Sequence, residues 1–148
     1  MAAIFDRDDI QPGLPGIVLM SHGGLAVATA DVVRMITGDT VNIAAFSLEE
    51  GQEAQAYMAQ AWEAIESLPE GTIVFTDLPN GTPANQLRMA AYANKRVVPY
   101  IAGFNLPLVI AALDLREDCG GEELIERLME LPSFGVVNGT DFLKKHIR

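Results

Sequence analysis

The stretch Gly16-Ile-Val-Leu-Met-Ser-His-Gly-Gly-Leu-Ala26 decides the fold. Its first half is an apolar run rich in β-branched residues, which is typical of a buried parallel strand. The run changes at once to Ser21 and His22, and two glycines follow before a helical pattern begins. Polar residues and glycines at the end of a parallel strand indicate a place where an α/β protein keeps its working groups.

Short apolar runs and helical stretches alternate along the rest of the chain. Strands separated by helices of this length imply right-handed crossovers and a parallel sheet covered on both faces. We therefore predict an α/β fold with three layers, in which a doubly wound, mainly parallel sheet carries helices on both faces. The predicted strands are residues 17–20, 41–48, 72–78 and 97–102; the predicted helices are residues 25–37, residues 52–68, one with Thr82 as N-cap and Pro83 as its first residue, one that begins near Leu106-Pro107, and residues 122–131.

The two ends of the chain fit this pattern less well. Residues 1–15 carry charges and prolines without an apolar period, so we predict a flexible N-terminal extension ahead of a single domain over residues 16–148. The apolar run 134–137 is too isolated to place from the pattern alone. An edge strand, added to a neighbouring subunit, is one interpretation of it. The basic tail 144–148 is interpreted as a solvated end.

Length and composition limit the class of protein. The 148 residues suit one domain, and 49% apolar with 20% charged residues is typical of a compact soluble protein. Ten Lys and Arg against twenty Asp and Glu give a formal charge of −10, which argues against nucleic acid as a partner. The single Cys119 has no cysteine to pair with, and we recognise no signal peptide or membrane span, so we expect a cytoplasmic protein.

Three strand ends carry unusual residues and are expected to converge at one edge of the sheet: residues 21–24, 77–83 and 103–107. His22, at the tip of the first strand, is suited to act as a nucleophile if a carboxylate fixes its tautomer. Asp77, at the end of the neighbouring strand, is the candidate for that carboxylate. The alternative interpretation is a histidine and an aspartate that only form turns.

Glycines and two helix starts near His22 indicate an anion site. Gly23 and Gly24 let a large group approach the backbone, and Gly81 and Thr82 stand at the start of the third helix. Amides at a helix start favour phosphate, although capping alone would also explain these residues. All ten Lys and Arg residues lie outside the three segments, so the arginine clamp of a phosphatase is missing and a phosphoryl carrier is favoured.

Other chemistries fit the sequence less well. A serine hydrolase would need Ser21 on a Gly-x-Ser-x-Gly elbow, of which only the second glycine is present, and adjacent Ser21 and His22 do not easily form the required hydrogen bond. One crevice histidine, one aspartate and the isolated Cys119 show no metal-ligand spacing. We expect neither a metal nor a cofactor.

In order and spacing, three segments resemble the signatures of the mannose-type IIA component of the bacterial sugar phosphotransferase system (PTS). The similarity runs from about residue 16 to 131, and residues 41–51 are also similar. The resemblance implies a doubly wound α/β fold and a homodimer that exchanges an edge strand, which would give residues 134–137 a purpose. The three segments are Ile17-Val-Leu-Met-Ser-His-Gly23, Phe75-Thr-Asp-Leu-Pro-Asn-Gly-Thr-Pro-Ala-Asn85 and Ala102-Gly-Phe-Asn-Leu-Pro-Leu108.

The resemblance also implies a reaction and its partners. His22 is expected to accept a phosphoryl group on Nε2 from the small carrier HPr and to pass it to a IIB component, with the membrane components IIC and IID served indirectly. Asp77 is expected to hold Nδ1 of the ring. The hydroxyl of Thr82 and the amides of Gly23 and Gly81 are expected to stabilise the phosphoryl group.

The sequence departs from the family pattern in one loop. The usual Thr-Asp-Leu-Phe-Gly-Gly-Ser-Pro reads Thr76-Asp-Leu-Pro-Asn-Gly-Thr-Pro83 here. The hydroxyl is kept, but Pro79 replaces the aromatic residue that the resemblance implies for an apolar docking surface. Asn80 tolerates positive φ nearly as well as glycine. Two other functions fit the same residues: a regulatory or ligand-binding module that is not phosphorylated, and a phosphoryl-donor subunit for dihydroxyacetone kinase.

Overall fold

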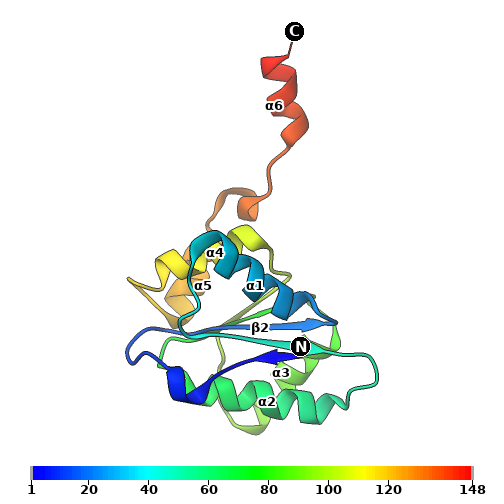
Figure 1. Cartoon of the computed structure of the whole chain (residues 1–148), viewed down its shortest axis with the longest axis vertical. Helices are drawn as coiled ribbons and strands as arrows, with labels where there is room; N and C mark the ends of the chain where they lie inside the picture. The colour runs from blue at the N-terminus through cyan, green and yellow to red at the C-terminus, as the bar shows by residue number, and fades with distance from the viewer. Residues whose placement is uncertain (1, 148) are drawn as a thin grey trace.

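The computed structural model describes residues 2–147, in which a five-stranded sheet lies between two layers of helices (Figure 1). The strand order is β1-β3-β2-β4-β5, with β1 antiparallel to β3 and the other strands parallel to one another. The predicted three-layer α/β fold with a mainly parallel, doubly wound sheet is confirmed. The strands are β1 (Ala3–Ile4), β2 (Ile17–His22), β3 (Ile43–Leu48), β4 (Ile73–Thr76) and β5 (Tyr100–Ala102).

The helices lie within a few residues of their predicted positions. The first ends at Thr37 as expected, because Gly38 adopts a φ of +77° and its amide donates to the Arg34 carbonyl oxygen. None of the described helices has the length and the apolar character to cross a membrane. The helices are α1 (Leu25–Thr37), α2 (Ala54–Ser67), α3 (Thr82–Ala93), α4 (Leu106–Leu115), α5 (Gly121–Met129) and α6 (Gly139–His146), with the 3-10 helices η1 (Arg7–Asp9) and η2 (Pro132–Gly135).

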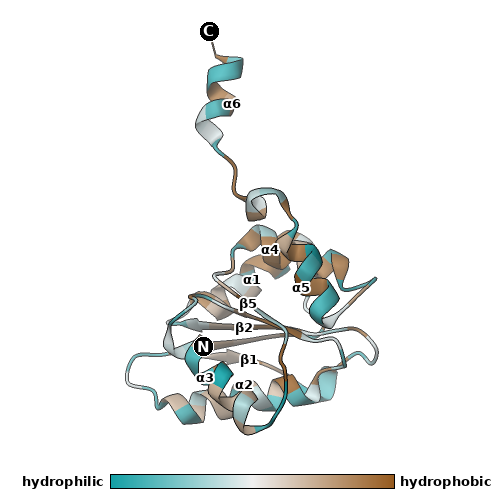
Figure 2. Ribbon diagram, turned by 180° about the vertical axis from the view of Figure 1, so that it is seen from behind, coloured by the Kyte–Doolittle hydropathy of each residue, from teal (hydrophilic) through white to brown (hydrophobic). Residues whose placement is uncertain are grey.

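Alternate side chains of the central strand face the two helical layers. Ile17 and Leu19 of β2 pack with α1, α4 and α5, whereas Val18 and Met20 pack with α2 and α3. All four side chains are fully buried. Helix α4 is apolar on most of its surface, as its brown colour in Figure 2 shows, because α1, α5 and η2 pack around it. The sheet is therefore a rigid platform whose strand ends carry the site.

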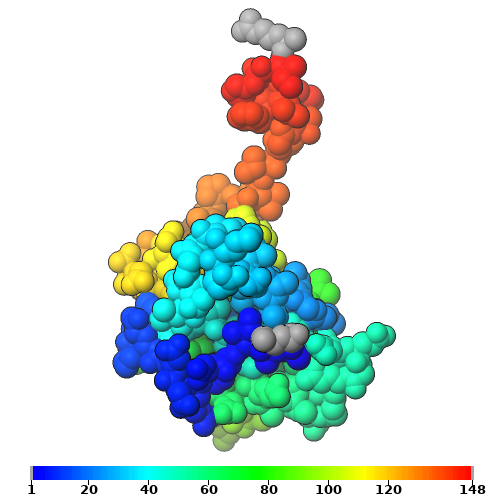
Figure 3. Space-filling view, viewed as in Figure 1, coloured from blue at the N-terminus to red at the C-terminus, as the bar shows by residue number. Residues whose placement is uncertain are grey.

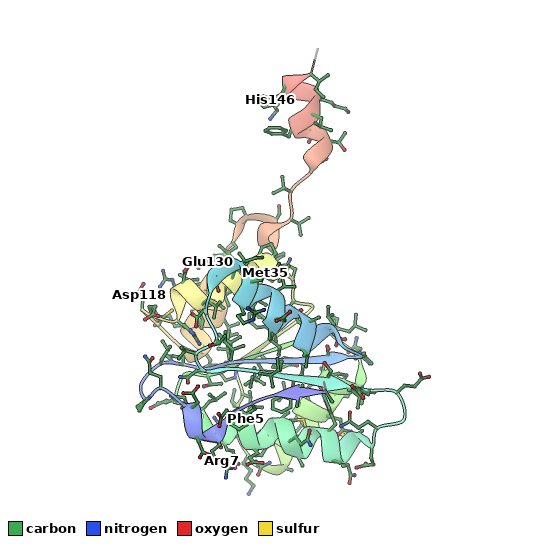
Figure 4. The ribbon with its side chains drawn as sticks, viewed as in Figure 1. Phe5, Arg7, Met35, Asp118, Glu130 and His146 are labelled. Carbon is green, nitrogen blue, oxygen red and sulfur yellow. The ribbon has the colours of Figure 1, made fainter. Side chains whose placement is uncertain are left out.

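The N-terminal residues differ from the expected extension without a packed element. Ala3 and Ile4 form β1 against Phe46 and Ala45 of β3. In η1, Arg7, labelled in Figure 4, forms an ion pair with Glu63 of α2. Two residues of strand are too few to produce a readable alternation, which is why the sequence pattern did not predict them.

A buried arginine fixes the end of this N-terminal segment. The side chain of Arg116, which follows α4, has no exposed surface. Its guanidinium donates to the Pro15 carbonyl oxygen at 3.2 Å and to Asp39 at 3.2 Å. Burial lowers the pKa of Arg116, and the neighbouring Asp39 carboxylate opposes that shift. The chain thus enters β2 from a point held by Arg116, which lies 101 residues after Pro15 in the sequence.

The C-terminal residues leave the body of the domain, as Figures 1 and 3 show. Residues 134–137 do not form the expected edge strand in the single chain. Ser133 and Phe134 adopt φ values of +49° and +53° within η2, and Val136 and Val137 are 66% and 80% exposed. Helix α6 follows, where the sequence indicated only a solvated tail, and none of its residues is buried.

Candidate active site

The carboxyl ends of β2 and β4 meet where the strand order reverses. From β2 the chain passes to β3 on one side, and β4 then lies on the other side of β2. Crossovers that leave in opposite directions open a crevice at such a point. His22 is the last residue of β2 and Asp77 is the first residue after β4. The fold therefore brings together the two side chains that were predicted to work as a pair.

One carboxylate oxygen of Asp77 holds the histidine in two places. Oδ2 lies 2.8 Å from Nδ1 of His22 and accepts the backbone N–H of His22 at 2.9 Å. The other oxygen, Oδ1, accepts the Leu78 amide at 2.9 Å. The Asp77 side chain is 9% exposed and the imidazole 45%. A carboxylate at Nδ1 favours the tautomer with the proton there, which leaves the lone pair on Nε2.

Gly81 lies against the imidazole ring. A Cβ atom at this position would lie 3.2 Å from Nε2 and only 2.4 Å from Cε1 of His22, and the second distance is shorter than real Cβ atoms show. The φ of Gly81 is −102°, an ordinary value, so the contact and not the backbone angle requires glycine. Asp77 and Gly81, from the two ends of one loop, thus fix the ring.

The start of α3 is open. Gly81 is the N-cap, not Thr82 as predicted, and Thr82 is the first residue of the helix with Pro83 after it. No side chain caps this end, and within residues 2–147 neither the Thr82 hydroxyl nor the amides of Gly81 and Thr82 have a hydrogen-bond partner. These donors can serve an anion, because a helix start also carries partial positive charge.

The start of α1 is closed by side chains from the sheet. The Ser21 hydroxyl accepts the Ala26 amide at 2.7 Å, and the Ser47 hydroxyl accepts the Val27 amide at 3.3 Å. Ser21 is fully buried. A buried hydroxyl that caps a helix is not placed to attack a substrate, so the geometry gives a serine hydrolase no support.

The Gly23 amide differs from its expected role in phosphoryl binding. It donates to the Leu48 carbonyl oxygen at 2.7 Å, so its hydrogen is already used. Gly23 still borders the site, with φ at +54° and no atom within 4 Å of a Cβ built on it. Because Gly23 has no side chain, it leaves space beside the His22 ring.

A groove of about 490 Å³ opens in front of the histidine. Of the three segments expected to converge, residues 103–107 do not line it; there, Asn105 caps α4 by accepting the Leu108 amide. The residues between β3 and α2 take that place, and sequence reasoning gave Glu49 and Glu50 no role. The only earlier signal was the similarity of residues 41–51. The lining residues are His22, Gly23, Leu48, Glu49, Glu50, Gly51, Gln52, Ala54 and Thr82.

A buried tyrosine, Tyr57, lies close enough to the site to be influenced by the charge of Asp77. The Tyr57 hydroxyl of α2 donates to the Phe46 carbonyl oxygen at 2.8 Å, and the residue is 1% exposed. Burial raises the pKa of Tyr57 far above its usual range, with a smaller contribution from the Asp77 charge. The phenol stays neutral at physiological pH and acts as part of the packing.

Fold and site together define a doubly wound α/β protein that carries a carboxylate-oriented histidine at its switch point. The sequence model of the family described as "PTS system fructose IIA component" matches residues 16–129. The chain therefore belongs to the PTS IIA components of the mannose and fructose type, which implies a part in phosphoryl transfer for sugar uptake. The family resemblance seen in the sequence is confirmed.

Individual relatives agree with this assignment. The fructose-specific EIIA component of Bacillus subtilis is 27% identical over 124 residues, which cover 81% of this chain and 84% of the relative. The mannose/sorbose-specific IIA subunit of Enterococcus faecalis is 28% identical, with a TM-score of 0.69 over 84% of this chain and 94% of that one. The EIIA component of Streptococcus agalactiae, at 17% identity, TM-score 0.78 and coverage of 86% and 99%, supports the fold alone.

Proposed function

We propose that this protein is a phosphocarrier that accepts a phosphoryl group from phospho-HPr on Nε2 of His22 and passes it to a IIB component, which serves the membrane components IIC and IID. One observation carries the proposal: Asp77 lies 2.8 Å from Nδ1 of an exposed imidazole. Within residues 2–147, Nε2 has no hydrogen-bond partner. The nucleophilic nitrogen is thus oriented and accessible.

The phosphoryl transfer needs only the imidazole of the donor histidine and the imidazole of His22. The Nε2 lone pair of His22 forms a bond to phosphorus while the bond from phosphorus to the donor histidine breaks and its electron pair returns to the donor nitrogen. The proton on Nδ1 of His22 stays in place, because Asp77 stabilises the positive charge that the ring gains. The Thr82 hydroxyl and the amides at the start of α3 face the oxygens of the transferred group.

The residues that line the groove suit transient rather than tight binding of the phosphoryl group. No Lys or Arg lines the groove, whereas the exposed Glu49 and Glu50 do. A cradle of neutral donors beside two carboxylates holds a phosphoryl group less firmly than an arginine clamp would. Carboxylates at the rim also favour the approach of a positively charged partner surface.

The deciding experiment is phosphoryl transfer from phosphoenolpyruvate through purified enzyme I and HPr, followed by intact mass. The wild type is expected to gain about 80 Da, one phosphoryl group, and the His22→Ala variant none. His146→Ala is the matched control and should gain the group normally, because His146 lies on α6, outside the groove. No gain by the wild type would refute the carrier function and favour an unphosphorylated regulatory module.

Asp77→Asn tests the orienting role in the same assay. The amide keeps the shape of the carboxylate but loses its charge, so the transfer rate should fall roughly 100-fold while the fold remains intact. An unchanged rate would contradict this role. Transfer from His22 to a dihydroxyacetone kinase subunit, and not to a IIB component, would indicate that the protein is a phosphoryl-donor subunit for that kinase.

We also propose a cytoplasmic homodimer, in which residues 134–137 of each copy pair with the β5 edge of the other. The exposure of Val136 and Val137, and the position of β5 at the end of the sheet, support this arrangement. The single Cys119, which forms no disulfide, is consistent with the cytoplasm. Light scattering should give twice the chain mass of 16.0 kDa, and the mass of one shortened chain after residues 132–148 are removed.

A further inference from the structure

We propose that Arg88 is a positioning residue of this site: it holds the loop 77–81 whose two ends fix the His22 ring. The kinetic part of this proposal rests on the proposed phosphocarrier function. The geometric part concerns the ring itself and can be measured without any phosphoryl donor.

The guanidinium of Arg88 joins three parts of the molecule. It projects from α3, and one of its terminal nitrogens donates to the Pro79 carbonyl oxygen at 3.0 Å and to the Tyr100 hydroxyl of β5 at 3.3 Å. The other terminal nitrogen donates to the side-chain oxygen of Asn85, one turn earlier in α3. No carboxylate pairs with Arg88 in residues 2–147, so its donors are directed to neutral oxygens of the loop, the sheet and the helix.

The loop depends on this contact because its middle has little else to hold it. Leu78, Pro79 and Asn80 are exposed. Pro79 has no amide hydrogen, and the hydrogen bonds of Leu78 are local ones, to the side chains of Asp77 and Thr76. The contact with Arg88 therefore ties the apex of the loop to the two elements that flank it.

Movement of the apex would reach the histidine from both sides. Asp77 precedes the apex and holds Nδ1, and Gly81 follows it and lies against Cε1. Sites for group transfer need their reacting groups within about 0.5 Å of the productive geometry. A loop released from Arg88 should therefore change the orientation and tautomer of the ring without removing any group that touches it.

The planar fork of arginine is needed for this arrangement. Two nitrogens must reach Pro79 and Tyr100 on one side and Asn85 on the other. A lysine supplies the same charge from a single nitrogen and cannot span these partners. Lysine at position 88 should thus preserve the electrostatic field and lose the positioning.

The experiment compares Arg88→Lys, Arg88→Met and the wild type, with Arg34→Met as the matched control. Arg34 is an exposed arginine of α1 whose partner is Asp31 of its own helix. The readouts are the ¹⁵N chemical shifts of the two His22 ring nitrogens, the rate and KM of phosphorylation by phospho-HPr, and the thermal midpoint. Should Arg88→Met fold poorly, Arg88→Lys and Tyr100→Phe, which removes one partner only, carry the same test.

We expect a mixed tautomer signal and about a tenfold lower rate in both Arg88 variants, with wild-type shifts and rate in Arg34→Met. Wild-type ring shifts in the Arg88 variants would overturn the proposal, even if their rate or thermal midpoint falls, since that result would indicate a structural role only. If the wild type itself accepts no phosphoryl group, the phosphocarrier function fails, and the ring shifts alone still decide the role of Arg88.

Discussion

The two helices that start beside His22, α1 and α3, differ in whether side chains cap their N-terminal amides. At α1, hydroxyls from β2 and β3 accept the amides of Ala26 and Val27, so the helix start is sealed from within. At α3, glycine is the N-cap, no side chain closes the end, and the Thr82 hydroxyl is left without a partner in the part of the chain that is described. Sequence reasoning treated both starts as one anion-binding environment.

The difference shows what a glycine or a serine at a strand end is used for. Ser21 and Ser47 stabilise the junction between sheet and helix, and the Gly23 amide continues the parallel β2–β3 ladder by donating to the Leu48 carbonyl oxygen. Gly81 and Thr82 leave their donors open and lie beside the imidazole. One helix start is therefore scaffold, and the other is the candidate binding surface. Three substitutions test that division.

The largest effect is expected from Gly81→Ala. The added methyl group would fall 2.4 Å from Cε1 of His22, so the ring must shift from the position in which its Nδ1 meets Asp77. We expect the rate of His22 phosphorylation to fall about 100-fold or more, with little loss of stability. Gly24→Ala at the α1 start, where a Cβ meets nothing within 4 Å, is the control and should keep the wild-type rate. A fast Gly81→Ala protein would mean that the ring contact is dispensable.

Thr82→Ala should have an intermediate effect. Loss of one neutral hydrogen bond to the phosphoryl group is worth about 1 kcal/mol, so single-turnover transfer should slow by roughly five- to tenfold. Thr82→Ser keeps the hydroxyl and should restore most of the rate. Equal rates for the alanine and serine variants would remove the hydroxyl from the mechanism.

Ser21→Ala should have the smallest effect on transfer. It deletes a cap of α1 and leaves the buried Ala26 amide unpaired, so we expect a stability loss of about 1–2 kcal/mol in urea unfolding. Transfer measured well below the unfolding transition should stay within about twofold of the wild-type rate. A large loss of activity without loss of stability would show that the α1 start also takes part in the reaction.

The sequence predicted those parts that depend on chain order and pattern. The crossovers and the meeting of His22 with Asp77 follow from the alternation of strands and helices, and the end of α1 follows from Gly38. The N-cap of α3 could not be predicted from this alternation, because both Gly81 and Thr82 are acceptable caps. The choice depends on how the loop 77–81 packs against the His22 ring.

Contacts between segments that are distant in the sequence could not be predicted from the pattern of strands and helices. Glu49 and Glu50 reach the groove only because β3 lies beside β2, and Arg88 reaches Pro79 because its long side chain folds back from α3. All ten basic residues lie outside the three segments along the chain, but in space Arg88 contacts one of them through the Pro79 carbonyl oxygen. A two-residue strand such as β1 leaves no periodic signal at all.

The two edges of the sheet differ in a way that bears on the proposed homodimer. At one edge β1 runs antiparallel to β3 and is two residues long, one residue shorter than β5. At the other edge β5 is paired on one side only, within the described residues. In the proposed homodimer the β5 edge of each copy is occupied by residues 134–137 of the other copy, so association through this edge would end with a pair and would not propagate into filaments.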